Sequence, residues 1–193
     1  MKRICVFISN KGTGTNLQAL IDAKFSIAAV ISDKKDAFGL VRAKKNGIPT
    51  LVYPLKNLKN KDARIIWGKS LAQIVKKKFS PDLIVLAGWM LILPSSFLEF
   101  FPDKVINLHP GLLGTHIPGF KGKMAGGAIK AALNMKLPFS GSTIHFVTSK
   151  VDEGRIINRA IEYFKKNDTV DSYYGRLKKK EHKILVEAVK SLL

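Results

Sequence analysis

Short apolar runs alternate with amphipathic stretches along this chain of 193 residues. The first unit is typical: the branched run Arg3–Ile8 leads into polar residues 9–16, and Leu17, Leu20 and Ile21 follow at helical spacing. This order predicts a strand, a loop and a helix. The same reasoning predicts strands at Ile27–Ser32, Thr50–Tyr53, Leu83–Ala87, Val105–Leu108, Ser142–Val147 and Arg155–Tyr163. It predicts helices at Ala37–Asn46, Lys61–Phe79, Pro94–Phe100, Ala125–Leu133 and Val170–Leu193.

The strand pattern indicates the fold class. Leu83–Ala87 is apolar throughout, which is typical of a strand buried on both faces of a parallel sheet. Such strands, alternating with helices, predict an α/β fold with a single doubly wound, mostly parallel, Rossmann-like sheet and helices on both faces. Because no repeat or long linker interrupts the pattern, we expect one domain over residues 1–193. Ligands should bind at the carboxyl ends of the strands.

Net charge is the most unusual feature of the composition. Lys and Arg total 33 against 14 Asp and Glu, a formal charge of +19, which by itself would suggest nucleic acid or an anionic membrane as partner. Most of these cations are Lys, spread along the chain in small groups, whereas nucleic-acid readout favours Arg. We therefore expect a solvated basic surface and no nucleic-acid partner. A basic nucleic-acid-binding module remains the alternative from a different class, and salt-dependent binding to DNA or RNA would test it.

Cysteine content and hydropathy bear on the compartment. The single cysteine, Cys5, has no partner for an internal disulfide, and the apolar run after Arg3 ends at Ser9 without forming a secretory signal. The longest apolar runs are far shorter than the roughly 20 residues of a membrane-spanning helix. These observations predict a cytoplasmic protein with no membrane partner.

The first candidate binding segment is the glycine-containing loop at residues 12–16. Backbone N–H groups and the start of a helix would favour an anion such as phosphate at Gly14, Thr15 and Asn16. Leu17 stands where a dinucleotide-binding motif has its third glycine, and no P-loop Lys follows, so neither a dinucleotide nor a nucleoside triphosphate is implied. The alternative is a tight turn in which Thr15 or Asn16 caps the helix.

The second candidate segment is the strand end Asn107-Leu108-His109-Pro110. Since side chains alternate along a strand, Asn107 and His109 lie on one face. An amide N–H donor and an imidazole together suit the oxyanion of a tetrahedral intermediate in acyl transfer. Asp152, in a polar turn between two strands, would orient His109 and raise its pKa. The alternative is a capped strand end with a hydrogen-bonded histidine.

These motifs, with others in the same order, resemble the phosphoribosylglycinamide formyltransferases, folate-dependent enzymes of purine biosynthesis. The matching segments span nearly the whole chain and comprise residues Gly14–Leu20, Asp82–Met90, Asn107–Pro110, His145–Val147 and Val151–Gly154. The resemblance implies the formyltransferase fold and transfer of a formyl group from 10-formyltetrahydrofolate to the amine of 5-phosphoribosylglycinamide. Direct attack would give a tetrahedral intermediate, with no metal or nucleotide required.

The resemblance also implies roles for individual residues. The catalytic set would be Asn107, His109 and Asp152. The phosphorylated substrate would be held by Gly14, Thr15 and Asn16, with Glu181 near its ribose. The folate would contact Asn107 again, together with Arg64, Met90, Leu91, Ile92 and Leu93. The four scattered histidines and one cysteine form no metal-ligand pattern.

Several positions depart from the usual family pattern. Leu91 replaces a common Arg, Gly126 or Gly127 replaces a common His, and Gly114 replaces a Pro. Related formyl-folate enzymes, methionyl-tRNA formyltransferase and formyltetrahydrofolate deformylase, share the Asn-x-His and Asp arrangement and stay as alternatives. Each carries an additional domain for which this chain has no room. The expected partners are small molecules, and the protein would be a monomer or homodimer.

Overall fold

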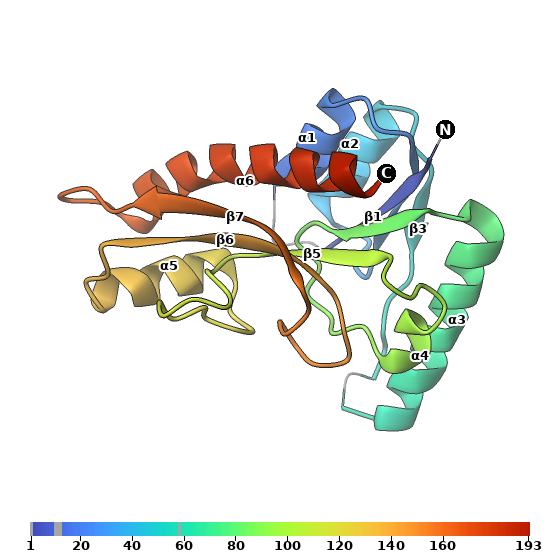
Figure 1. Cartoon of the computed structure of the whole chain (residues 1–193). Helices are drawn as coiled ribbons and strands as arrows, with labels where there is room; N and C mark the ends of the chain where they lie inside the picture. Colours follow the sequence, from blue (N-terminus) through green and yellow to red (C-terminus); the bar gives the residue numbers. More distant parts are fainter. Residues whose placement is uncertain (1, 10–12, 58) are drawn as a thin grey trace.

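One seven-stranded sheet forms the centre of the protein. The computed structural model describes residues 2–9, 13–57 and 59–193 (Figure 1). The strands follow the order β3-β2-β1-β4-β5-β6-β7. Their bounds are β1 Ile4–Ile8, β2 Ile27–Ser32, β3 Thr50–Val52, β4 Leu83–Leu86, β5 Val105–His109, β6 Phe139–Phe146 and β7 Ile156–Tyr163. The strands from β3 to β5 pair in parallel, and the β5–β6 and β6–β7 pairs are antiparallel.

Helices cover both faces of this sheet, so the doubly wound, mostly parallel fold is confirmed. They are α1 Thr15–Asp22, α2 Phe38–Lys45, α3 Lys61–Phe79, α4 Ser95–Leu98, α5 Ala125–Asn134 and α6 Val170–Leu192. In Figure 1, α1, α2 and α6 lie on one side of the sheet, and α3 and α4 lie on the other. Alternate residues of β1 show the division, because Val6 packs with the first group of helices and Phe7 with the second.

The last two strands differ from a regular strand–helix alternation. β6 begins at Phe139, three residues before the predicted start at Ser142, because Phe139 pairs across the sheet with Tyr163 and their rings lie 5.5 Å apart. No helix separates β6 from β7, so the chain reverses direction. Pairing of β6 with β5 places His145 directly opposite Asn107.

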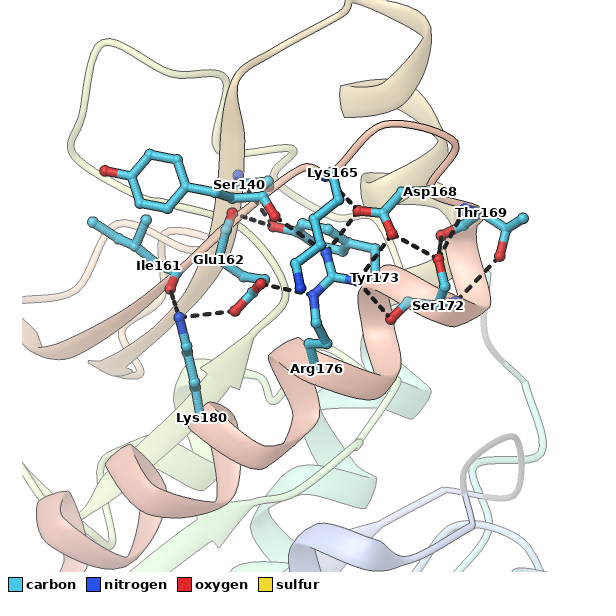
Figure 2. Close-up of polar contacts among 11 residues, drawn as sticks. Ser140, Ile161, Glu162, Lys165, Asp168, Thr169, Ser172, Tyr173, Arg176 and Lys180 are labelled. Atoms are coloured by element: carbon cyan, nitrogen blue, oxygen red, sulfur yellow. Dashed lines mark hydrogen bonds and ion pairs between the residues drawn. The ribbon is translucent and has the colours of Figure 1, made fainter.

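The start of α6 is fixed by a polar network on β7 (Figure 2). Thr169 and Ser172 form a capping box. One turn later, Arg176 bonds Glu162 at 2.9 Å and Asp168 at 2.6 Å. The network holds α6 across the sheet, and this places Glu181 of α6 over β6.

Candidate functional site

A cavity of about 570 Å³ opens over the carboxyl ends of β1, β4 and β5, where ligands were expected. Its walls come from segments far apart in the sequence. They include the glycine-containing loop and start of α1, the segment after β4, the end of β5, the loop before α5, the loop after β6, and one face of α6.

The end of β5 forms the polar floor of this cavity. Asn107 and His109 both line it, as strand alternation predicts. Asn107 Nδ2 lies 3.3 Å from His145 Nε2. The Nδ1 atom of His145 lies 2.8 Å from the Phe146 carbonyl, so Nδ1 carries a proton and donates to that oxygen.

His109 is almost fully buried, and each of its ring nitrogens faces an oxygen. Nε2 lies 2.7 Å from the Gly119 carbonyl, and Nδ1 lies 3.3 Å from Asp152 Oδ2. Gly111 must lack a side chain here, because a Cβ would lie 2.0 Å from that carbonyl and 2.9 Å from His109 Nε2. The backbone at Gly111 and Gly119 therefore packs directly against the imidazole.

Asp152 joins the two histidines. Its Oδ1 lies 3.5 Å from His145 Nε2, and its Oδ2 also accepts the Gly122 N–H at 3.0 Å. Burial raises the pKa of Asp152, but the His145 contact, the Gly122 N–H and the charge of His109 together bring it below its ordinary value. Asp152 is therefore an ionised carboxylate at neutral pH.

The expected net rise in the pKa of His109 is wrong. Burial has the largest effect and lowers the pKa below its ordinary value, although the Gly119 carbonyl and Asp152 both act to raise it. The effect of Asp152 on this pKa therefore has the predicted direction, but burial outweighs it. Sequence reasoning missed this because burial depends on the loop that covers His109.

The glycine-containing loop meets α1 at one side of the cavity. Gly14 caps the helix with a left-handed φ of 69°, and no side chain caps it, so the suggested Thr15 or Asn16 cap is wrong. Gly14, Thr15 and Asn16 all line the cavity, and Asn16 Oδ1 is buried without a hydrogen-bond partner among the described residues. Gly12 lies outside the described residues.

Glu181 lines the same cavity from α6. It is 1% exposed, and its Oε1 accepts the Ser142 hydroxyl at 2.5 Å. Its Oε2 has no partner within the part of the chain that the structure describes. Burial raises the pKa of Glu181 above its ordinary value. A buried acceptor of this kind suits a ligand hydroxyl.

The segment after β4 forms an apolar wall. Met90, Leu91, Ile92 and Leu93 all line the cavity. Arg64 does not line it, but its guanidinium donates to the Ile92 carbonyl at 2.7 Å. Arg64 therefore supports this segment from α3. Leu91 places an apolar side chain where the usual family pattern has an Arg.

Known proteins resemble this chain in both sequence and fold. The family model described as formyl transferase matches residues 2–189. The chain belongs to the formyl transferase family. It is 43% identical to phosphoribosylglycinamide formyltransferase of Dictyostelium discoideum, covering 98% of this chain and 97% of the relative. It is 40% identical to the Haemophilus influenzae enzyme of the same name, over 98% of this chain and 86% of that enzyme.

Solved structures of the formyl transferase family agree. The phosphoribosylglycinamide formyltransferase of Streptococcus pneumoniae matches with a TM-score of 0.85 and 33% identity, over all of this chain and 99% of that one. The phosphoribosylglycinamide formyltransferase of Bacillus halodurans matches with a TM-score of 0.86 and 29% identity, over all of this chain and 95% of that one. The predicted resemblance, the formyltransferase fold and the enzyme class are confirmed.

Two features of this formyl transferase site were not predicted from its sequence. His145 was recognised only as part of a motif, yet it contacts both Asn107 and Asp152. Its position two residues after Thr143 on β6 could have indicated a shared face. Gly119 carried no signal, because its carbonyl reaches His109 only through the path of the loop.

Across residues 2–9, 13–57 and 59–193, no group of three or more His, Cys, Asp or Glu side chains is placed to hold a metal ion. None of the helices described is long and apolar enough to cross a membrane.

Proposed function

We propose that this member of the formyl transferase family transfers a formyl group from 10-formyltetrahydrofolate to the amine of 5-phosphoribosylglycinamide. The observation that carries the proposal is the cavity floor. An amide donor, a buried imidazole and an ionised carboxylate converge there between an apolar wall and the start of a helix. The flat folate ring suits the apolar wall, and phosphate suits the helix start.

The reaction proceeds by direct attack. The amine lone pair forms a bond to the formyl carbon, and the carbonyl oxygen becomes an oxyanion. The nitrogen then loses a proton, and the bond to the folate nitrogen breaks as that nitrogen takes up a proton. No Cys lines the cavity among the described residues, and the Ser9 hydroxyl on its wall is held by Asp33 and the Met90 N–H. This favours transfer without a covalent enzyme intermediate.

Asn107 and His109 stabilise the oxyanion. One Nδ2 proton of Asn107 points to His145, and the other is available to the formyl oxygen. The 2.7 Å contact of His109 Nε2 with the Gly119 carbonyl supports a role for this ring nitrogen as a donor to a negatively polarised oxygen, such as the formyl oxygen. Asp152 stabilises the imidazolium and assists proton transfer from the amine.

The substrate-binding roles follow from the remaining walls. Gly14, Thr15 and Asn16 bind phosphate with their backbone N–H groups, and Glu181 accepts a ribose hydroxyl. The folate lies along Met90, Leu91, Ile92 and Leu93, contacting Asn107 at its formyl end, while Arg64 acts through the Ile92 carbonyl.

The remaining parts of the proposal concern the whole protein. The reaction requires no metal or nucleotide, and its partners are the two small-molecule substrates. We assign the chain to the cytoplasm, as a single domain over residues 1–193 that acts as a monomer or homodimer, with neither nucleic acid nor membrane as a partner.

A steady-state assay tests this function. Conversion of 10-formyltetrahydrofolate to tetrahydrofolate is followed with and without phosphoribosylglycinamide. We expect turnover only when the amine is present, with one formylated amine formed for each tetrahydrofolate. Equal turnover without the amine would instead identify a deformylase, and no turnover under either condition would reject the proposal.

A further inference from the structure

A buried carboxylate outside the catalytic set contacts the end of β1. Asp33 follows β2 directly, as Ser9 follows β1, and the paired ends Ile8 and Ser32 bring them together. Asp33 is 3% exposed and Ser9 is 5% exposed. A carboxylate buried this deeply is costly unless hydrogen bonds satisfy it.

The contacts of Asp33 lead to the folate wall. Ser9 Oγ donates to Asp33 Oδ1 at 2.5 Å, and the Met90 N–H donates to Ser9 Oγ at 3.1 Å. A hydroxyl has one proton and two lone pairs, so giving its proton to Asp33 directs a lone pair to Met90. The Lys34 ammonium, at 4.0 Å from Asp33 Oδ2, is a much weaker contact.

A second hydrogen bond connects Ser9 to the segment that precedes Met90. The Ser9 N–H donates to the Gly88 carbonyl at 3.1 Å, and Gly88 has a left-handed φ of 87°. Ser9 therefore holds the chain on both sides of Trp89. Arg64 holds the other end of the segment through the Ile92 carbonyl. Trp89 and Leu93 anchor this wall in the core, whereas Met90 and Ile92 are about half exposed, so the backbone at these two positions depends on its hydrogen bonds.

We propose that Asp33 is a positioning residue, which acts through Ser9 to set the backbone of residues 88–90 in the conformation that receives the formyl donor. Asp33 does not line the cavity, whereas Ser9 and Met90 do. The identity of the donor rests on the proposed function; the hydrogen-bond chain does not. The glycine-containing loop at residues 12–16 and Glu181 lie on other walls, so binding of the phosphorylated amine should depend on Asp33 much less than binding of the formyl donor does.

Substitutions at Asp33 and Ser9 test the proposal. Asp33→Leu removes the acceptor, and we expect the KM for 10-formyltetrahydrofolate to rise about tenfold, with the KM for the amine changed less than about twofold. Asp33→Asn keeps an oxygen that accepts the Ser9 proton, so it should restore the KM to within about twofold of the native value. Ser9→Ala removes the hydroxyl that connects Asp33 to Met90, so it should raise the KM for 10-formyltetrahydrofolate as much as Asp33→Leu does.

Binding provides a readout that does not need turnover. Trp89 immediately precedes Met90 and lines the cavity, so tryptophan fluorescence can report tetrahydrofolate binding. We expect weaker tetrahydrofolate binding in Asp33→Leu and Ser9→Ala. Tyr173→Phe is the matched control, because it removes buried hydrogen bonds to Ser140 and Glu162 away from the cavity. It should lower Tm and leave both KM values unchanged.

The outcomes separate this proposal from the proposed function. Absence of formyl transfer in the native protein would reject the function alone, since tetrahydrofolate binding would still test the role of Asp33. An active native enzyme whose Asp33→Leu and Ser9→Ala variants keep native folate binding would overturn the positioning role. Equal increases in both KM values, or an Asn variant as impaired as Leu, would also overturn it.

Discussion

Opposing effects act on the pKa of His109. Burial favours the neutral ring, whereas Asp152 and the Gly119 carbonyl favour the protonated one. Both ring nitrogens face oxygen acceptors, an arrangement that only the doubly protonated ring satisfies completely. The environment of His109 therefore contains groups that favour each protonation state, and acid–base catalysis by a histidine uses both states.

Replacing His109 with Ala tests its role in the transition state. We expect kcat to fall by about 10²–10⁴-fold, because a proton-transfer group and an oxyanion donor are both lost. The KM values for both substrates should change little, since His109 contributes mainly after the amine attacks. Near-normal turnover in His109→Ala would contradict the mechanism.

Asp152→Asn separates charge from structure at the neighbouring carboxylate. Asp152 has a left-handed φ of 54°, which Asn tolerates well, so the variant should fold. Removing the negative charge lowers the pKa of His109 further, and the protonated ring then persists only to lower pH. The alkaline limb of the kcat profile should move toward acid. A destabilised variant with an unchanged pH profile would assign Asp152 to the turn alone.

The sequence predicts the polar residues of the site better than it predicts their environment. Asn107, His109 and Asp152 could be proposed because strand alternation and motif order are local properties of the chain. The contact of Gly119 with His109 depends on the path of a loop, and the role of His145 depends on strand pairing. Neither is encoded in a short stretch of sequence.

Strands and helices were predicted nearly throughout, because hydrophobic periodicity reports directly on which faces of an element are buried. The start of β6 was predicted three residues too late, at Ser142 instead of Phe139. The strand extends beyond its apolar run there because Phe139 pairs with Tyr163. The cap of α1 was also wrong. Backbone conformation at Gly14, rather than a polar side chain, begins that helix.

Gly14→Ala tests why glycine is needed at the start of α1. A Cβ would lie 3.1 Å from the Gly39 Cα, so it would press against α2. With the strain of a left-handed φ, we expect the free energy of unfolding to fall by about 1–3 kcal/mol. The KM for the phosphorylated amine should rise more than that for the folate, because the loop shifts.

Gly175→Ala is the matched control for Gly14→Ala. Gly175 lies in α6, where a Cβ would meet nothing within 4 Å, so Ala should stabilise the protein by roughly 0.5–1 kcal/mol. Chemical denaturation measures both effects. Equal KM increases for the two substrates in Gly14→Ala would mean that the loop serves only as a turn.

The network at the start of α6 predicts a pH-dependent stability. The Arg176 hydrogen bond holds the pKa of Asp168 well below its ordinary value. Its stabilising effect is therefore complete above the unfolded-state pKa of about 4 and is lost as pH falls below it. Arg176→Gln should lower Tm clearly at pH 7 and less at about pH 3. Lys183→Gln, in an exposed pair with Glu187, should change Tm little at either pH.

Across the whole molecule, many acidic side chains are committed to internal contacts. Of the 14, five have side chains that are largely buried: Asp33, Asp152, Glu162, Asp168 and Glu181. The surface is correspondingly more basic than the composition alone suggests. A field of this sign raises the local concentration of anions around the cavity, and both proposed substrates carry negative charge.

Ionic strength tests whether this field contributes to catalysis. Raising the salt concentration from about 0.01 M to about 0.5 M shortens the screening length from about 30 Å to a few ångströms. We expect kcat/KM for the phosphorylated amine to fall by about tenfold, because encounter is slowed, with kcat unchanged because screening acts on the encounter and not on the bound complex. A substrate analogue without the phosphate is the control and should lose much less. If both amines lose kcat/KM equally, the salt acts on the protein or on the folate, and the lysine-rich surface then serves solubility rather than recognition of the phosphorylated substrate.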